Sequence, residues 1–139
     1  MRKKWDGQKT NLSGEFFVAA ESFKRGHQVS ITLGAAKSVD LFVYNEDLNH
    51  TYNVQVRALR EKSNNFPIGI EQVKPELIYV FVVLNAIGTP VEYFHLTGNE
   101  LIDNEKEIWG EGGGSGKRPG IYPSRLKDYK DRWDVFERK

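Results

Sequence analysis

The run IYVFVVLN, at residues 78–85, constrains the fold of this 139-residue chain more than any other stretch. Its residues are apolar and mostly branched or aromatic up to Leu84, without the polar alternation of a strand that has one wet face. Such a run is typical of a strand that is covered on both faces. The sequence therefore predicts a sheet with this strand in its interior and with further layers packed on either side.

Strands and helices are expected along the chain in the order helix, three strands, loop, two strands and helix. Residues 12–25 predict a helix, because Asn11 or Ser13 can cap its start and Gly26 follows its end. The expected strands are 29–34, 39–45, 52–59, 78–85 and 91–97, and a short helix is expected at 98–109. The second and third strands flank a polar turn and predict an antiparallel hairpin. This order predicts an α+β or mixed α/β fold.

The first helix is expected to pack on the sheet through one apolar face. A rotation of about 100° per residue collects four side chains on that face: Phe16, Ala19, Ala20 and Phe23. Glu15 lies at the edge of this face and is expected to look into a cleft. Near the other end of the chain, residues 125–136 predict a short helical piece that ends on aromatic residues.

The composition is that of an ordinary globular protein, and we expect a single domain over residues 1–139. Lys and Arg number 20 and Asp and Glu number 19, so any contact with nucleic acid must be local. The charge is uneven, with six acidic residues and one basic residue in 92–111, and eight basic and four acidic residues in 117–139. Because there is no cysteine, no apolar run of membrane-spanning length and no signal-peptide pattern, a cytoplasmic protein without a membrane partner is expected.

The segment EGGGSGKRPG at residues 111–120 predicts a flexible surface loop, as does the segment 1–11. It is not a Walker A loop, because Arg follows its Gly-Lys pair and Glu111 stands where the first glycine is required. An alternative interpretation is that Lys117 and Arg118 contact a phosphate backbone.

Polar side chains near the predicted hairpin form a candidate site. Asp40 opens a strand that is otherwise apolar, and a carboxylate there is costly unless it is exposed or liganded. Gln55 and Arg57 share one face of the next strand, because side chains alternate along a strand, and Glu15 comes from the preceding helix. The pattern also fits an ordinary amphipathic strand, in which Arg57 pairs with Asp40 across the hairpin and Glu15 complements the helix N-terminus.

The order and spacing of these pieces resemble the PD-(D/E)xK nuclease-like superfamily over most of the chain. The matching stretches are GEFFVAAESFKRGHQVSITLGAAKSVDLFVYN, NVQVRALR, LIYVFVVLN and VEYFHL. The family pattern has Gly-Glu-x-x-Val-Ala on a helix, Arg-Gly at its end, a strand, Asp before hydrophobic residues, and then Gln-Val-Lys or Glu-x-Lys. The resemblance implies a restriction-endonuclease-like core, with a helix followed by a mixed central sheet and flanking helices. It also implies nucleic acid as a partner and raises the expectation of a homodimer.

The resemblance further implies a catalytic site for Mg²⁺ or Mn²⁺. Carried over to this chain, Asp40 is the metal carboxylate and Gln55 the second ligand. The Val56 carbonyl supplies another oxygen, and Glu15 is the helix acid. Mg²⁺ takes hard oxygen ligands and keeps several waters. One of these waters attacks the phosphate while the metal offsets the developing charge, and the family's Lys positions the water and stabilises the anion.

Two positions depart from the family pattern. Gln55 is neutral and binds Mg²⁺ more weakly than Glu would. Arg57 replaces the Lys, and because Arg stays protonated it can hold a phosphate but cannot act as a general base. Lys37, three residues before Asp40, is a candidate to take over that role.

Three interpretations therefore stay open. The chain is a metal-dependent nuclease that hydrolyses phosphodiester bonds, with Glu15, Lys37, Asp40, Gln55 and Arg57 as its catalytic residues. Alternatively it is a catalytically inactive nuclease-like domain that binds nucleic acid or a protein partner. The third interpretation is an unrelated α+β domain whose Gln55–Arg57 strand is merely amphipathic.

Overall fold

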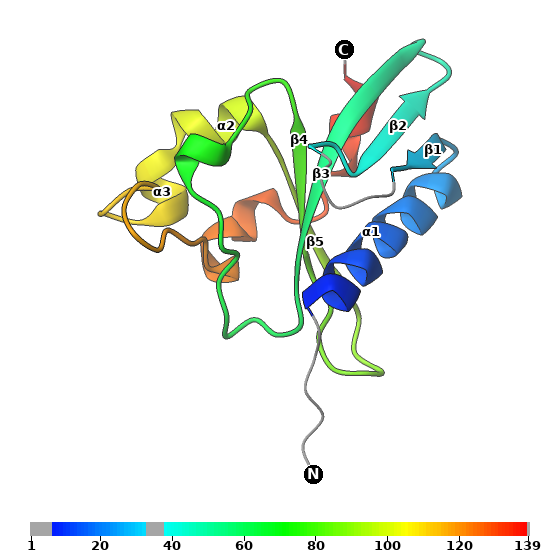
Figure 1. Ribbon diagram of the computed structural model, residues 1–139. Coiled ribbons are helices and arrows are strands. Elements are labelled where there is room, and N and C mark those ends of the chain that lie inside the picture. Colours follow the sequence, from blue (N-terminus) through cyan, green and yellow to red (C-terminus); the bar gives the residue numbers. More distant parts are fainter. Residues whose placement is uncertain (1–6, 33–37, 139) are drawn as a thin grey trace.

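A computed structural model describes residues 7–32 and 38–138 of the chain. Its centre is a five-stranded mixed sheet whose strands neighbour one another in sequence order (Figure 1). The strands are β1 (Gln28–Ile31), β2 (Leu41–Asn45), β3 (His50–Leu59), β4 (Ile78–Val83) and β5 (Glu92–Thr97). β3 and β4 run parallel, whereas the other three neighbouring pairs are antiparallel. The predicted hairpin is thus the β2–β3 pair, and the prediction of a mixed sheet is confirmed.

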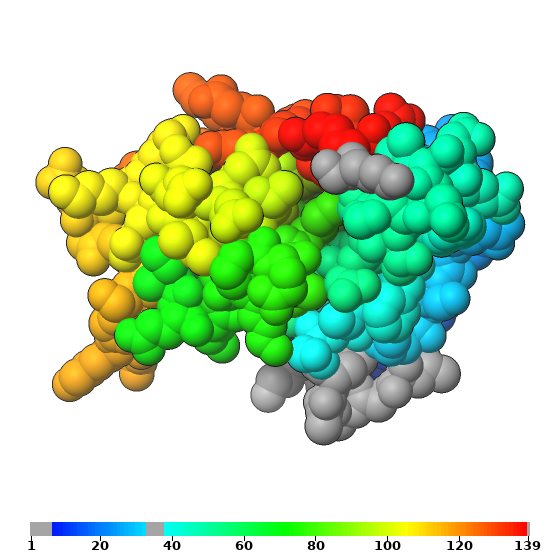
Figure 2. Space-filling view, turned by 90° about the horizontal axis from the view of Figure 1, so that it is seen from above, coloured from blue at the N-terminus to red at the C-terminus, as the bar shows by residue number. Residues whose placement is uncertain are grey.

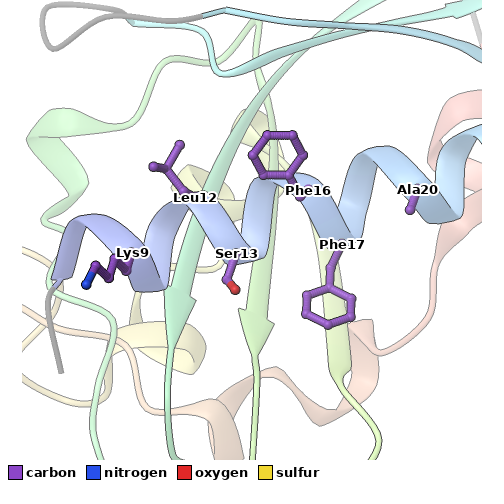
Figure 3. A pocket seen from close by; sticks show the side chains of 6 residues that line it. All are labelled: Lys9, Leu12, Ser13, Phe16, Phe17 and Ala20. Carbon is purple, nitrogen blue, oxygen red and sulfur yellow. The ribbon is translucent and has the colours of Figure 1, made fainter.

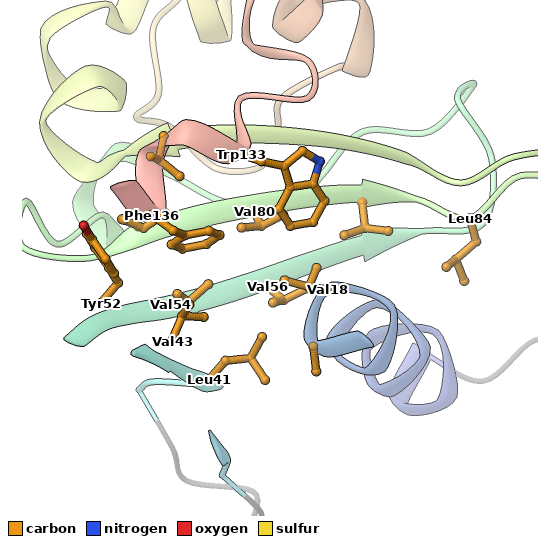
Figure 4. Close-up of a cluster of buried hydrophobic side chains, with 14 residues drawn as sticks. Val18, Leu41, Val43, Tyr52, Val54, Val56, Val80, Leu84, Trp133 and Phe136 are labelled. Atoms are coloured by element: carbon orange, nitrogen blue, oxygen red, sulfur yellow. The ribbon is translucent and has the colours of Figure 1, made fainter. Parts of the chain in front are cut away.

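Strand β4 is buried along its whole length, as the sequence predicted. Its residues alternate between two hydrophobic cores, one on each face of the sheet. Ile78, Val80 and Val82 belong to the core that also contains Val18 of the N-terminal helix, which we call the α1 core (Figure 4). Tyr79 and Phe81 belong to the core on the opposite face, which we call the α2 core.

Helical segments cover both faces of the sheet and complete a three-layer α+β arrangement (Figure 1). The α1 core lies under α1 (Gly7–Lys24) and the 3₁₀ segment η3 (Trp133–Glu137). The α2 core lies under α2 (Gly98–Asp103), α3 (Glu105–Trp109) and the 3₁₀ segment η2 (Pro123–Tyr129). A further 3₁₀ turn, η1 (Ile70–Gln72), lies in the connection from β3 to β4. Among the described residues, no helix is both long and apolar enough to cross a membrane.

Helix α1 begins at Gly7 instead of residue 12, so residues 7–11 are helical where the sequence predicted flexibility. Two side chains of its first turns attach it to the end of β3. Thr10 Oγ1 accepts a hydrogen bond from Arg60 Nε at 3.0 Å. Asn11 Oδ1 accepts one from the Ala58 amide at 3.2 Å, and so it serves the strand instead of capping the helix.

The predicted packing face of α1 is wrong for Phe16, Ala20 and Phe23, which are exposed, whereas Ala19 is buried as predicted. Phe16, Phe17 and Phe23 are 55%, 44% and 52% exposed. The buried residues are instead mostly small, namely Thr10, Gly14, Glu15, Val18, Ala19 and Ser22. The reason is the close approach of the helix to the sheet, since a Cβ added to Gly14 would lie 2.8 Å from the Ala58 Cβ.

The exposed side of the helix, which we call the α1 apolar face, carries Leu12, Phe16, Phe17 and Ala20 (Figure 3). Together with Lys9 and Ser13 these residues line a shallow depression of about 460 Å³. The largest apolar side chains of the helix therefore point away from both cores.

His95 in β5 is fully buried in the α1 core, and neither of its ring nitrogens has a hydrogen-bond partner among the described residues. Its ring packs edge-on against Trp133, with 4.3 Å between the ring centroids. Burial, together with the positive charges of Arg25 and Arg132, lowers the pKa of His95 to about 3. His95 is therefore neutral in the folded protein at pH 7, while an unfolded His titrates near pH 6.5.

This difference predicts a loss of stability in acid that is specific to His95. Between pH 6.5 and about pH 3 the unfolded chain binds a proton that the folded chain excludes, which costs about 1.4 kcal/mol per pH unit. From pH 7 to pH 5, wild type should lose about 2 kcal/mol more unfolding free energy than His95→Leu, which cannot take up that proton. Urea unfolding at both pH values measures this difference, and equal losses in the two proteins would contradict it.

Candidate active site

Asp40 lies immediately before β2 and extends the pairing of β2 with β3. Its amide donates to the Val54 carbonyl at 2.9 Å, and its Oδ2 accepts from the Val56 amide at 2.8 Å. The carboxylate thus replaces a backbone carbonyl at the end of the antiparallel ladder. Asp40 is only 8% exposed. A buried carboxylate loses its hydration, and the hydrogen bond from the Val56 amide offsets part of that free-energy cost.

Thr32, which follows β1, holds the backbone at this point. Its Oγ1 donates to the carbonyls of Val39 and Asp40, at 2.5 Å and 3.1 Å. Its amide also donates to the Asp40 carbonyl at 2.9 Å. The entry of the chain into β2 is therefore fixed from two sides, by β3 and by the residue after β1.

Gln55 and Arg57 project from β3 toward the α2 core, opposite to Val56. Their partners in the parallel register are Tyr79 and Phe81, respectively. Gln55 Nε2 donates to the Ser38 carbonyl at 3.2 Å, so the amide side chain reaches across to the segment before β2.

Arg57 has only neutral acceptors among the described residues. Its Nε and Nη2 donate to Gln55 Oε1 at 3.3 Å and 3.2 Å, and Nη1 reaches the Pro67 carbonyl at 3.5 Å. In the part of the chain that the structure describes, Arg57 forms no ion pair with Asp40. The guanidinium is therefore a half-buried positive charge that no described carboxylate neutralises.

Glu15 is 4% exposed and lies on the buried side of α1 instead of at the edge of a cleft. The preceding residue, Gly14, packs against Val56 and Ala58. Helix α1 therefore brings Glu15 to the same strand that receives the Asp40 carboxylate. The predicted helix acid comes from the α1 side of β3, whereas Gln55 and Arg57 lie on its other side.

The structure thus gathers Asp40, Gln55 and Arg57 around the backbone of Val56, and Lys37 lies outside the described residues. Over residues 7–32 and 38–138, no three Asp, Glu, His or Cys side chains form a metal-binding group. A divalent ion here would have to rely on amide and carbonyl oxygens as well as carboxylates. These are hard donors that suit Mg²⁺, but Gln55 Oε1 now accepts two hydrogen bonds from Arg57.

Sequence reasoning missed three neighbours of this site: Thr32, Ser38 and Pro67. Ser38 and Pro67 contribute backbone carbonyls, which any residue type could supply, so no residue pattern marks them. Tyr79, in the strand beside Gln55, was predicted only as a core residue. Its hydroxyl accepts from the Lys74 amide at 2.8 Å, and burial raises the pKa of Tyr79 despite that hydrogen bond and the positive charge of Arg57.

Comparison with known proteins identifies the class of fold. No protein-family model and no curated protein matches the sequence. A bacterial homing endonuclease matches the structure with a TM-score of 0.61 at 12% identity, over 96% of this chain and 95% of its own. The Holliday junction resolvase Hjc of Archaeoglobus fulgidus matches with a TM-score of 0.58 at 11% identity, over 93% of this chain and 97% of its own.

These similarities extend over nearly the whole length of both proteins. The chain therefore shares the overall fold of these two proteins. The fold that the sequence predicted and the resemblance implied, a mixed central sheet with an N-terminal helix and flanking helices, is confirmed.

The Asp40–Val56 hydrogen bond predicts a difference between two substitutions. Asp40→Ala leaves the buried Val56 amide without this acceptor and should lower the unfolding free energy by about 1–3 kcal/mol. Asp40→Asn keeps an oxygen acceptor and should lose clearly less, as measured by urea unfolding at pH 7. Asp103→Ala, at an exposed position of α2, is the control and should stay within about 0.5 kcal/mol of wild type. Equal losses in Asp40→Ala and Asp40→Asn would contradict this role of Asp40.

Proposed function

We propose that this chain is a metal-dependent nuclease that hydrolyses phosphodiester bonds of nucleic acid. The observation that carries the proposal is the Asp40 carboxylate held on the Val56 amide, with Gln55 and Arg57 on either side of that residue. Its fold is similar to those of a homing endonuclease and a junction resolvase, which supports the same class of activity. The cytoplasmic location expected from the sequence stays a prediction.

The residues fit distinct tasks in such a reaction. Asp40, Gln55 and the Val56 carbonyl would hold Mg²⁺ or Mn²⁺, with Glu15 as the acid from α1. The bound ion would supply a water of lowered pKa and offset charge on the phosphate. Arg57 would bind the phosphate through its fork of N–H donors, since it stays protonated. Lys37 is the remaining candidate to position the attacking water.

The second candidate is a domain that binds nucleic acid or a protein partner without cleaving a substrate, and one specific contact favours it. Arg57 donates two hydrogen bonds to Gln55 Oε1, the oxygen that a metal would need. A Lys at position 57 would present a single, more flexible ammonium group. If the Arg57–Gln55 contact persists in solution, Gln55 is not available to the metal and the site holds substrate only.

A cleavage assay separates the two candidates. Purified protein would be incubated with plasmid, linear duplex, single-stranded DNA and RNA, in Mg²⁺, in Mn²⁺ and in EDTA. We expect cleavage that requires the metal and that falls at least 100-fold in Asp40→Asn, because an amide replaces the charged ligand that precedes β2. Asp103→Asn serves as the matched control and should cleave like wild type. Cleavage in EDTA, or equal cleavage by Asp40→Asn, would exclude the proposed mechanism.

Two further variants complete that assay. Lys37→Ala should reduce cleavage if Lys37 positions the water, and full cleavage by this variant would remove it from the mechanism. If wild type cleaves nothing under any condition, the Arg57→Lys variant would be assayed in the same way. Cleavage gained by this one substitution would assign the inactivity to Arg57, whereas continued inactivity would favour the binding function.

The homodimer implied by the family resemblance remains a proposal, and we assign it to the α1 apolar face. Phe16 and Phe17 are half exposed there, and exposed apolar patches commonly mark association sites. The net charge of +1 gives two copies little electrostatic repulsion. Light scattering during size-exclusion chromatography should give twice the chain mass for wild type and the single mass for Phe16→Ser/Phe17→Ser. A wild-type monomer at high micromolar concentration would contradict this assignment.

A further inference from the structure

The glycine-rich segment 111–120 is anchored to the rest of the structure at Gly114 and at Ile121, the residue that follows it. The amide of Gly114 donates to Glu105 Oε2 at 2.8 Å, and its carbonyl accepts from the Ile70 amide at 2.8 Å. Immediately after the segment, Ile121 forms an antiparallel bridge with Phe66, with hydrogen bonds of 2.7 Å and 2.9 Å. The segment is therefore tied to α3 and to the connection from β3 to β4.

Two of its glycines are required by close packing instead of by flexibility. A Cβ on Gly114 would lie 2.8 Å from the ring of Trp109 and 2.9 Å from the Ile70 Cβ. A Cβ on Gly120 would lie 2.5 Å from Asn65 Oδ1. The absence of side chains lets the segment lie flat on Trp109 and Asn65, and this leaves a groove above them.

This groove, which we call the glycine-loop groove, has a volume of about 390 Å³ and a polar lining. Lys117 and Arg118 lie along it, and both are exposed. Among the described residues, neither cation makes a hydrogen bond or an ion pair. Glu105, the nearby acid of α3, is already engaged by the Gly114 amide. The groove therefore presents two positive charges that nothing in the described structure neutralises.

An aromatic ring completes the groove. Tyr122 lines it and is 51% exposed, although large aromatic side chains are usually buried. Trp109 forms the floor, since its Nε1 donates to the Ile68 carbonyl at 2.8 Å and Gly114 covers part of its ring. Tyr122 is therefore the ring that a planar ligand can stack on.

The groove and the candidate active site share a wall, the segment 65–68 in the connection from β3 to β4. Arg57 donates to the Pro67 carbonyl on one side of it, and Trp109 donates to the adjacent Ile68 carbonyl on the other. In the space-filling view from above, the green connection lies between the orange glycine loop and the cyan strands β2 and β3 (Figure 2). Arg57 and the groove therefore lie on opposite sides of the same short segment.

We infer that the glycine-loop groove binds an unpaired segment of the nucleic-acid substrate, next to the phosphate held at Arg57. Lys117 and Arg118 contact its phosphates, and Tyr122 stacks on an unpaired base. Stacking on a protein ring requires a base that is free of its neighbours, which favours a single strand over an intact duplex. A volume of about 390 Å³ accommodates one nucleotide but no base-paired helix. The inference rests on the proposed function for its ligand and does not depend on cleavage.

Binding without cleavage tests this inference. Fluorescence anisotropy in EDTA would measure the affinity of the full chain for labelled single-stranded DNA and RNA of equal length, for a duplex and, by competition, for inorganic phosphate. For the single strands, Lys117→Gln/Arg118→Gln should weaken binding at least tenfold. It should also reduce the slope of log affinity against log salt by about 1.4, for two lost phosphate contacts. Tyr122→Ala should weaken binding about fivefold or more, with little change in that slope.

Matched variants keep these results interpretable. Lys24→Gln/Lys127→Gln removes the same charge at exposed positions outside the groove and should stay within about twofold of wild type. Lys117→Arg/Arg118→Lys keeps both positive charges and should retain most of the wild-type affinity for single strands. Urea unfolding checks that each variant is folded.

The outcomes separate this inference from the proposed nuclease function. Equal losses for the groove variant and the Lys24/Lys127 control would overturn the inference, even if wild type cleaves. The assignment to a single strand would be overturned if the groove variants weakened the binding of the duplex only. It would also be overturned if inorganic phosphate displaced the labelled single strand from wild type as well as an oligonucleotide does. If the groove variants bind single strands much more weakly than wild type, and wild type cleaves no substrate, the inference about the groove would be supported and the proposed nuclease function rejected. No binding of any oligonucleotide by wild type would overturn the inference.

Discussion

The parallel pairing of β3 with β4 is the constraint on which the rest of the structure depends. Parallel neighbours cannot be joined by a tight turn and need a crossover connection. Here the crossover is the segment 60–77, which passes over the α2 face of the sheet. It supplies the Pro67 carbonyl to Arg57 and the Ile68 carbonyl to Trp109. The same connection therefore closes the sheet, surrounds the candidate site and supports the glycine-loop groove.

The side chains of β3 alternate between the two faces of the sheet, and both faces are covered by other parts of the chain. Val54 and Val56 enter the α1 core, and this leaves Gln55 and Arg57 on the opposite face. A shift of the register by one residue would exchange these two sets and bury the guanidinium beneath α1. The close contact of Gly14 with Val56 and Ala58 admits no such exchange. Packing on one face thus fixes the position of the polar groups on the other.

The fold was largely predictable because its strongest signals are local. The apolar run at β4, the β2–β3 hairpin and the order of elements follow from patterns that a short window of sequence contains. The proximity of Asp40 to Gln55 also follows from the hairpin register. The residue-type pattern could not reveal the acceptor role of Asp40, since that depends on where the β2–β3 ladder ends. It also could not place the Ser38 and Pro67 carbonyls.

Other expectations failed because contacts distant in sequence override local preference. The apolar face of α1 was assigned from its phenylalanines, but the distance between helix and sheet is set by Gly14 and admits mainly small residues. The start of α1 depends on Arg60 and Ala58, about fifty residues away. No partner was predicted for the glycine segment, yet Glu105 and Ile70 both form hydrogen bonds with Gly114. In each case the residue that determines the local structure lies too far away in the sequence for a local pattern to include it.

The contact between Arg57 and Gln55 links the proposed phosphate-binding residue to a proposed metal ligand. Among the described residues the Arg57 guanidinium binds only neutral oxygens. It would exchange them readily for a phosphate, because hydrogen bonds between opposite charges are about twice as strong. A substrate phosphate at Arg57 would therefore release Gln55 Oε1, the amide oxygen that we propose as a metal ligand. Substrate and metal would then bind cooperatively, and each would strengthen the other by the same factor. Under the proposed nuclease function, Arg in place of Lys would make metal binding at this site depend on the bound substrate.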